Sequence, residues 1–395
     1  MIDRIFPGHR RQGAFLSFGF RPFFLAAALF GGLAMLLWLP MLAGDATLPT
    51  TFAPLEWHVH EMLFGYLSAV LAGFLLTAVP SWTGCDRLRG PVLGWLALAW
   101  LAGRAAVAVS AWIGAVPAAV IDLAFMPLLI AWAASRIVAA GKTRNLAVLA
   151  VVGAFFAGDV LFHWEAAQGR MEVGLRLGLA AAVMLVMVIG GRIVPAFTRN
   201  WLATRGPGRM PGASGRLEAA TVAVAVLALL AWVAAPSAAP VAALLLLAGL
   251  AQSLRLARWA GERTGAEPLL LILHLGYACV PTGFLLMGAA ALWPDVVPVS
   301  SAIHAWTVGA VGLMTLAVMT RATLGHTGRP LTAGVATRLI YVCAGGALLA
   351  RLCAPLAANP LPLLYVAGGL WVAAFLGFAA AYSRMLTAPR LGAAE

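Results

Sequence analysis

The chain has 395 residues, of which 63% are hydrophobic and only 10% are charged, and its mean hydropathy is +0.94. A soluble domain is nearer half apolar and a quarter charged, so this composition excludes a water-soluble globular protein. The net charge of +12 would suit nucleic acid, but the basic residues are spread over many loops, as membrane topology requires, and not gathered in one patch. We therefore expect a lipid bilayer as the partner and no nucleic acid.

Apolar runs of about 20 residues, long enough to cross a bilayer, recur along the chain. The first run is of full span length, without the shorter apolar core and small-residue cleavage site of a signal peptide, so we interpret it as a transmembrane helix. The predicted spans are 22–42, 57–79, 92–111, 116–135, 145–164, 174–197, 217–235, 239–257, 268–292, 301–320, 335–356 and 361–383. The predicted fold class is all-α, a polytopic integral membrane protein with about twelve transmembrane helices.

The basic residues distinguish the two sides of this membrane. Of the 26, 21 lie at the two termini and in the even-numbered loops, starting with Arg4, Arg10 and Arg11, whereas the odd-numbered loops hold only Arg170 and Arg176. Cytoplasmic loops carry such an excess of Lys and Arg. The distribution predicts a multi-pass protein of a bacterial inner membrane with both termini in the cytoplasm.

One inner loop is longer than the others. Residues 199–216 are rich in Gly, Pro and Arg and form a linker between two predicted six-helix halves, 1–198 and 217–395. We expect one membrane domain, 1–395, with this cytoplasmic loop between its halves.

Ionisable groups inside a bilayer are costly, so each one is a candidate for function. In the predicted topology most of them lie near the outer face. His58, His60 and Glu61 begin the second span, Asp159 and His163 end the fifth, and His304 begins the tenth. Asp122, Arg104 and Arg351 lie at a similar depth.

Residues two apart on a helix point about 200° apart, so His58 and His60 serve two neighbouring sites, or one is a ligand and the other supports it. Asp159 and His163 are four apart and share a face, which is the spacing of a carboxylate that holds a ligating imidazole. A smaller set lies toward the inner face: Arg192, His274, Arg321 and His326.

Several buried imidazoles with few thiolates suit haem iron, copper or zinc. The candidate metal ligands are His58, His60, His163, His304, His274 and His326. Arginines inside a haem protein often pair with propionates, because a guanidinium matches a carboxylate in shape and charge. The candidate cofactor-binding residues are therefore Arg104, Arg192, Arg321 and Arg351. Glu61, which shares a helix face with His58, and Asp159, which shares one with His163, are added as carboxylates that could hold a ligating imidazole.

Four stretches carry a resemblance to a known family. They are FRPFF at 20–24, WHVHEMLFGYLSAVLAGFLLTAVPSWTG at 57–84, GGRIVPAFTRN at 190–200 and HAWTVGAVGLMTLAVMTRATLGHTGR at 304–329. In order and spacing they resemble the NnrS family of haem- and copper-containing membrane proteins, over nearly the whole chain. The resemblance implies haem b, copper, and a role in relieving nitrosative stress with nitric oxide or a similar small gas as the partner. It implies neither a defined reaction nor an electron donor.

Two other readings stay open. A twelve-span secondary transporter could use the intramembrane Asp, Glu, His and Arg residues as a proton relay, although these residues gather near one face and not at the midplane. A respiratory haem–copper oxidase or nitric oxide reductase also has about twelve helices, but its adjacent His-His pair and His-Pro-Glu-Val-Tyr stretch do not occur here.

The topology can be tested with reporter fusions. Fusions at Arg144, Arg209 and Arg390 should report the cytoplasm, whereas fusions at Asp45 and Asp295 should report the outside, because of the positive-inside charge distribution. A single inverted loop in alkaline phosphatase and fluorescent-protein fusions would contradict the twelve-span arrangement.

Overall fold

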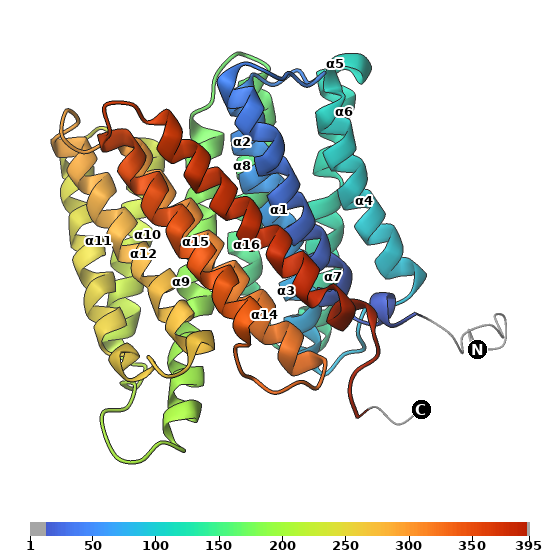
Figure 1. Ribbon diagram of the computed structural model, residues 1–395, viewed down its shortest axis with the longest axis vertical. Helices are drawn as coiled ribbons and strands as arrows, with labels where there is room; N and C mark the ends of the chain where they lie inside the picture. The colour runs from blue at the N-terminus through green and yellow to red at the C-terminus, as the bar shows by residue number, and fades with distance from the viewer. Residues whose placement is uncertain (1–12, 393–395) are drawn as a thin grey trace.

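The computed structural model describes residues 13–392, which leaves Arg4, Arg10 and Arg11 outside the described part. Within residues 13–392 every regular element is helical, and twelve helices or broken helices are long and apolar enough to span a membrane. They are Phe20–Ala43 (α1), Pro54–Thr83 (α2 to α3), Pro91–Ala108 (α4), Ala115–Ala139 (α6 and α7), Thr143–Ala166 (η5 and α8), Val173–Leu202 (α9), Arg216–Ala234 (α10), Ala239–Ala257 (α11), Pro268–Leu292 (α12), Val299–His326 (α13 to α14), Val335–Leu356 (α15 and η8) and Leu361–Thr387 (α16). The predicted all-α fold with twelve spans is confirmed (Figure 1).

Several boundaries differ from the prediction. Helix α9 continues to Leu202 and α10 begins at Arg216, so the linker between them is shorter than 199–216. The third span ends at Ala108 and is followed by a short separate helix, α5 (Ser110–Ile113). The tenth span runs on to His326, which lies in its last turn and not beyond it.

Four spans form the interior of the bundle. The apolar windows of the second, sixth, ninth and tenth spans are 78%, 56%, 67% and 72% buried, whereas the other windows are 28–39% buried. The outer helices expose large apolar side chains such as Trp95 and Val335, as expected for a surface in contact with lipid. The second and tenth spans, which carry His58, His60 and His304, are therefore the most enclosed part of the protein.

Three spans are interrupted close to the candidate site residues. The second consists of α2 (Pro54–His60), a π-helical turn (η4, Glu61–Gly65) and α3 (Tyr66–Thr83), and the tenth has a π-helical segment (η7, Ala305–Leu313) between α13 (Val299–His304) and α14 (Met314–His326). The fourth span breaks between α6 (Ala115–Leu123) and α7 (Phe125–Ala139), because Pro127 has no N–H to donate to the carbonyl of Leu123. π-Turns inside helices are frequent at functional sites.

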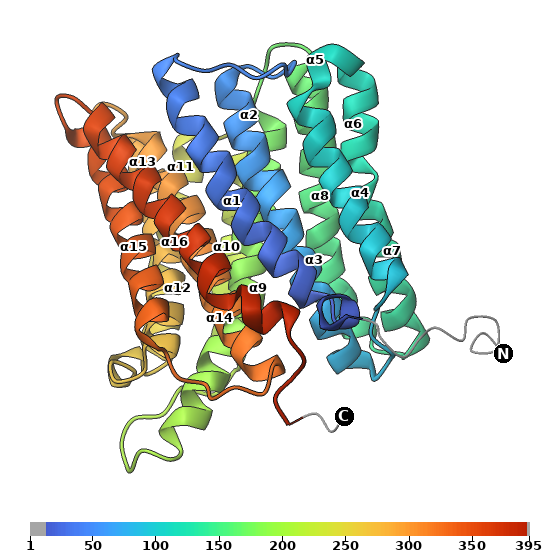
Figure 2. The same cartoon turned by 45° about the vertical axis from the view of Figure 1, so that its right-hand side comes forward.

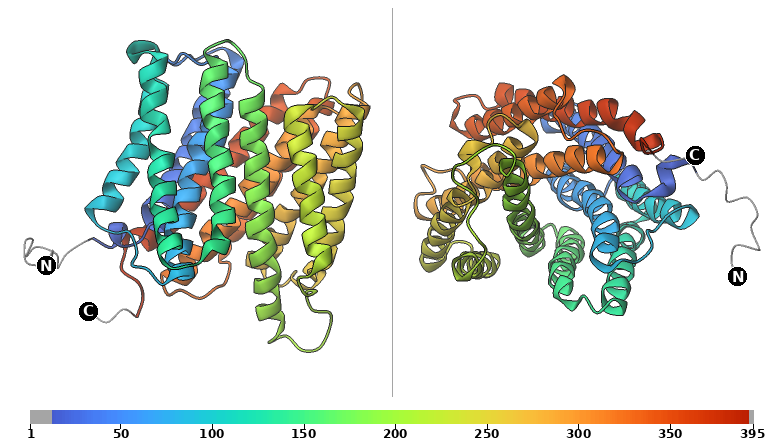
Figure 3. Two further views of the ribbon diagram at one scale, coloured as in Figure 1. Left: turned by 180° about the vertical axis from the view of Figure 1, so that it is seen from behind. Right: turned by 90° about the horizontal axis from the view of Figure 1, so that it is seen from below.

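The first and last spans lie side by side. Helix α1 begins and α16 ends at the same end of the bundle (Figures 1 and 2), as an even number of spans requires. There the buried guanidinium of Arg21 donates to the carbonyls of Leu386 at 2.9 Å and Ala388 at 2.6 Å, which caps the last turn of α16. Seen from behind (Figure 3), α8 and α9 are neighbours, and they approach closely where Gly158 meets Gly178.

Candidate metal centre and adjacent histidine cavity

The two histidines of α2 face different surroundings. His60 is fully buried among side chains from α6 and α8, whereas His58 lines a cavity on another side of α2. Residues two apart on an α-helix point about 200° apart, and this explains why the two side chains face different surroundings. Helix α2, which carries both histidines, lies at the end of the bundle opposite the termini, which is the predicted outer side (Figure 1).

His60 contacts carboxylates through both of its ring nitrogens. Its Nδ1 lies 3.0 Å from Glu61 Oε1, and its Nε2 lies 3.1 Å from Asp159 Oδ1 and 3.2 Å from Asp122 Oδ2. A neutral imidazole carries only one N–H, so it cannot donate to carboxylates on both sides. The ring must therefore be an imidazolium, face a protonated carboxyl group, or share a cation with the Asp pair at Nε2.

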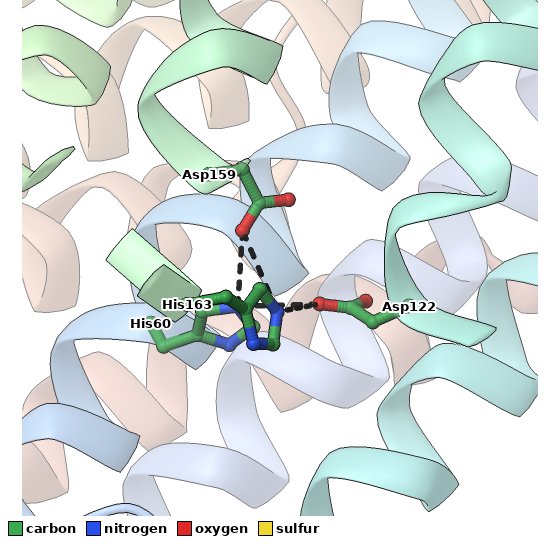
Figure 4. Close-up of side chains that lie close together, drawn as sticks. All are labelled: His60, Asp122, Asp159 and His163. Atoms are coloured by element: carbon green, nitrogen blue, oxygen red, sulfur yellow. Dashed lines mark hydrogen bonds and ion pairs between the residues drawn. The ribbon is translucent and has the colours of Figure 1, made fainter. Parts of the chain in front are cut away.

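His163 also belongs to this group. It lies one helical turn after Asp159 in α8 (Leu146–Ala166). Its Nε2 lies 2.9 Å from Asp122 Oδ2 and 4.0 Å from Asp159 Oδ1. One ligating atom from each of His60, Asp122, Asp159 and His163 lies within 4.8 Å of the others, in an arrangement that could hold a metal ion (Figure 4). The spacing of four between Asp159 and His163 places both on the face of α8 that meets His60, as predicted.

Arg104 of α4 forms ion pairs with two carboxylates of this group. Its Nη1 donates to both Glu61 oxygens at 2.8 Å, and its Nη2 donates to Asp122. We call the six residues His60, Glu61, Arg104, Asp122, Asp159 and His163 the carboxylate–histidine cluster. If both imidazoles are neutral, its three carboxylates and single guanidinium leave two negative charges in excess in a buried site. That excess matches a divalent cation or two protons.

Two glycines make room for the ion pairs of Arg104. A Cβ on Gly65, in the π-turn, would lie 2.4 Å from Arg104 Nη1 and 2.7 Å from Glu61 Oε2. A Cβ on Gly103 would lie 2.7 Å from Asp122 Oδ1. The backbone at these positions must therefore stay without side chains for Arg104 to reach both carboxylates.

The cavity lined by His58 has a volume of about 430 Å³, and we call it the histidine cavity. His304 and Arg351 line it together with mainly apolar side chains such as Leu63 and Trp371. The His304 Nδ1–H donates to the Ser300 carbonyl at 2.7 Å, which leaves the Nε2 lone pair free.

His58 is held differently. Its ring stacks on Trp38, with ring centroids 4.3 Å apart, and its buried Nδ1 has no hydrogen-bond partner in the described structure. No described carboxylate lies within ion-pair distance of Arg351. The histidine cavity thus contains two imidazoles and one guanidinium without an anionic partner.

In the described structure, the residues predicted near the inner face do not form a cluster with one another. His274 is buried and bonds through Nε2 to the Thr198 hydroxyl at 2.9 Å, whereas His326 is exposed and packs against Phe18 and Phe20. The Arg321 guanidinium lies over the Phe197 ring, 4.2 Å from its centroid. Arg192 is exposed on the surface of α9.

Sequence reasoning did not identify the residues that orient the cavity histidines. Trp38 lies in the first span with no polar neighbour in sequence to mark it. His304 bonds to the backbone carbonyl of Ser300, which every residue type carries, so the sequence holds no signal for this contact.

Gly65→Ala tests the packing of the cluster. The added methyl group has to displace Arg104 from Glu61, so we expect a loss of about 1–3 kcal/mol of stability, as for other overpacked cores. A lower melting temperature of the purified protein in detergent would report this loss. Gly153→Ala in α8 is the matched control, because a Cβ there meets no atom within 4 Å. Equal melting temperatures for the two variants would contradict the interpretation.

Comparison with known proteins identifies the family of this chain. No curated protein matches the chain. The model of the family described as NnrS protein matches residues 14–390, which is nearly the whole sequence and includes every residue of the carboxylate–histidine cluster and the histidine cavity. The chain therefore belongs to the NnrS family.

Proposed function

We propose that this chain is a haem- and copper-binding inner-membrane protein that binds or consumes nitric oxide and so relieves nitrosative stress. Membership of the NnrS family fits a membrane protein related to nitric oxide. The observation that carries the proposal is the division of His58 and His60 between two adjacent, differently built sites. Both sites lie toward the predicted outer face, with the termini in the cytoplasm.

The histidine cavity suits haem b. His304 donates its Nδ1–H to Ser300, so its unprotonated Nε2 could hold haem iron, and His58 would supply a second imidazole with an unpartnered buried nitrogen. The mainly apolar walls suit a porphyrin, and Arg351 is available for a propionate because no described carboxylate pairs with it. We therefore assign His58, His304 and Arg351 to haem binding.

The carboxylate–histidine cluster suits a divalent cation, which we assign as copper. Two imidazoles and two carboxylates converge, and a divalent ion balances the two negative charges in excess. With a metal at His60 Nε2, the Nδ1–H donates to Glu61, which is in turn held by Arg104. This is the carboxylate–histidine–metal arrangement that orients a ligating imidazole.

The side chains around both sites suit a small uncharged ligand. Haem iron and copper, when bound, supply one-electron redox chemistry and coordination positions for a diatomic gas. The buried side chains around His60 exclude water, and the Arg104 guanidinium offsets part of the carboxylate charge. Trp38 and Ser300 keep the two cavity imidazoles in fixed orientations.

An absorbance spectrum tests the haem assignment. Protein purified from a haem-replete host should show a Soret band, and His304→Ala should lose most of it because the imidazole that would hold the haem is removed. Arg351→Leu should retain less haem per protein than the wild type. His274→Ala is the matched control, since its imidazole bonds to Thr198 and does not line the cavity.

The His274→Ala variant also tests whether the haem lies toward the outer or the inner end of the bundle. Loss of haem in His274→Ala, with the band kept in His304→Ala, would move the haem to the inner level and contradict the assignment. A wild type without a Soret band, after expression with added haem precursor, would refute haem binding.

Metal analysis tests the copper assignment. Glu61→Gln removes the carboxylate that orients His60, so we expect a roughly 10–100-fold weaker affinity for copper, as for other residues that support a metal ligand. Glu56→Gln is the matched control on the same helix, where the carboxylate caps α2 by accepting from the Ala53 N–H. Equal copper retention by both variants during dialysis against a chelator would contradict the assignment.

The transporter alternative predicts a different result for the same cluster. Two protons on His60 and His163 would neutralise it as well as a divalent ion does, and this favours a proton relay. In that case the purified protein would bind no copper at micromolar concentration, and reconstituted vesicles would show proton movement that Asp159→Asn abolishes.

A further inference from the structure

A second cavity, separate from the histidine cavity, lies on the other side of the carboxylate–histidine cluster. Its volume is about 320 Å³ and it is bounded mainly by α6 and α8. Its walls include Ala115, Ala118 and Ala119 of α6 and Ala166 of α8. We call it the alanine cavity, because small alanine side chains from both helices leave the space open.

The alanine cavity reaches both the lipid-facing surface and the cluster. Val116 and Val120 of α6 are 74% and 65% exposed, and Trp164 of α8 is 56% exposed, so part of the cavity wall lies on the apolar outer surface of two membrane-spanning helices. His163 is the only ionisable side chain in the wall, and its Nε2 contacts Asp122 of the cluster. The cavity therefore connects the membrane with one of the four residues that could hold a metal ion.

The hydroxyl of Ser110 in the wall is already hydrogen-bonded. The Ser110 hydroxyl donates to the Val107 carbonyl at 3.0 Å and accepts from the Thr51 backbone N–H at 2.8 Å. It also lies 3.1 Å from the hydroxyls of Thr50 and Thr51. A polar guest would find few free hydrogen-bonding groups before it reached His163, and a charged guest would lose its hydration against apolar walls.

We infer that the alanine cavity binds a small, uncharged, apolar molecule of diatomic-gas size and forms a lateral route for it from the bilayer to His163. Such molecules partition into hydrocarbon, so a route that starts at this outer surface supplies them without passage through the aqueous face. The cavity volume exceeds that of one diatomic molecule, which suits a route with room for movement and not a tight single site. The inference does not require either cofactor to be bound.

Xenon is the probe, because apolar protein cavities bind it and it needs no metal. Crystals of the full-length protein under xenon pressure should show anomalous density in the alanine cavity, and ¹²⁹Xe NMR of the protein in lipid nanodiscs should report the same binding. Ala119→Phe places a ring in the cavity and should remove the xenon signal. Ala131→Phe is the matched control, since Ala131 is exposed in the same span and does not line the cavity.

Three results would overturn the inference: absence of xenon from the wild-type cavity, equal xenon occupancy in both variants, or continuous density for an acyl chain that excludes xenon. If Ala119→Phe does not fold, Ala118→Leu fills less of the same wall and should reduce the occupancy in part. A protein without haem and copper that still binds xenon here would leave this inference intact while the proposed function failed.

Discussion

The structure depends on the neutralisation of three buried carboxylates within a membrane-spanning bundle. Glu61, Asp122 and Asp159 come from three different spans and are nearly inaccessible to solvent. An unpaired charge in such a place would cost several kcal/mol, so the surrounding helices must supply compensating groups at fixed positions. Arg104 compensates two of the carboxylates, and the two imidazoles face the remaining oxygens.

The irregular helices lie close to these carboxylates and to the histidine cavity. The π-turn after His60 and the break at Pro127 occur in the spans that supply Glu61 and Asp122, and a second π-segment follows His304. A regular helix offers side chains only every 100° or so, and a local change in winding re-aims those that follow. His58 and His60 precede the π-turn in the regular helix α2, where an offset of about 200° presents His60 to the cluster and His58 to the histidine cavity. Two sites of different chemistry share a single rigid element.

Much of the fold was readable in the sequence, because hydropathy and basic residues respond to the bilayer directly. All twelve spans were predicted, and the spacing of Asp159 and His163 correctly placed them on one face. Asp122 was a candidate partner of Arg104 from its similar depth, but the pairing of Arg104 with Glu61 was not predicted, since it depends on which spans are neighbours and on the close approach at Gly65 and Gly103. The position of His274 away from the outer histidines was predicted from its depth, whereas its hydrogen bond to Thr198 depends on helix packing that no local pattern records.

The contact between Arg21 and the last turn of α16 has a consequence for biosynthesis. Arg21 belongs to the first span to leave the ribosome, and the carbonyls of Leu386 and Ala388 that it binds belong to the last. Helix α1 packs along α16, so its final neighbour does not exist while the first eleven spans are being inserted. The first span must therefore wait in the membrane with this guanidinium solvated at the interface. The bundle closes on that side only after the twelfth span has been inserted.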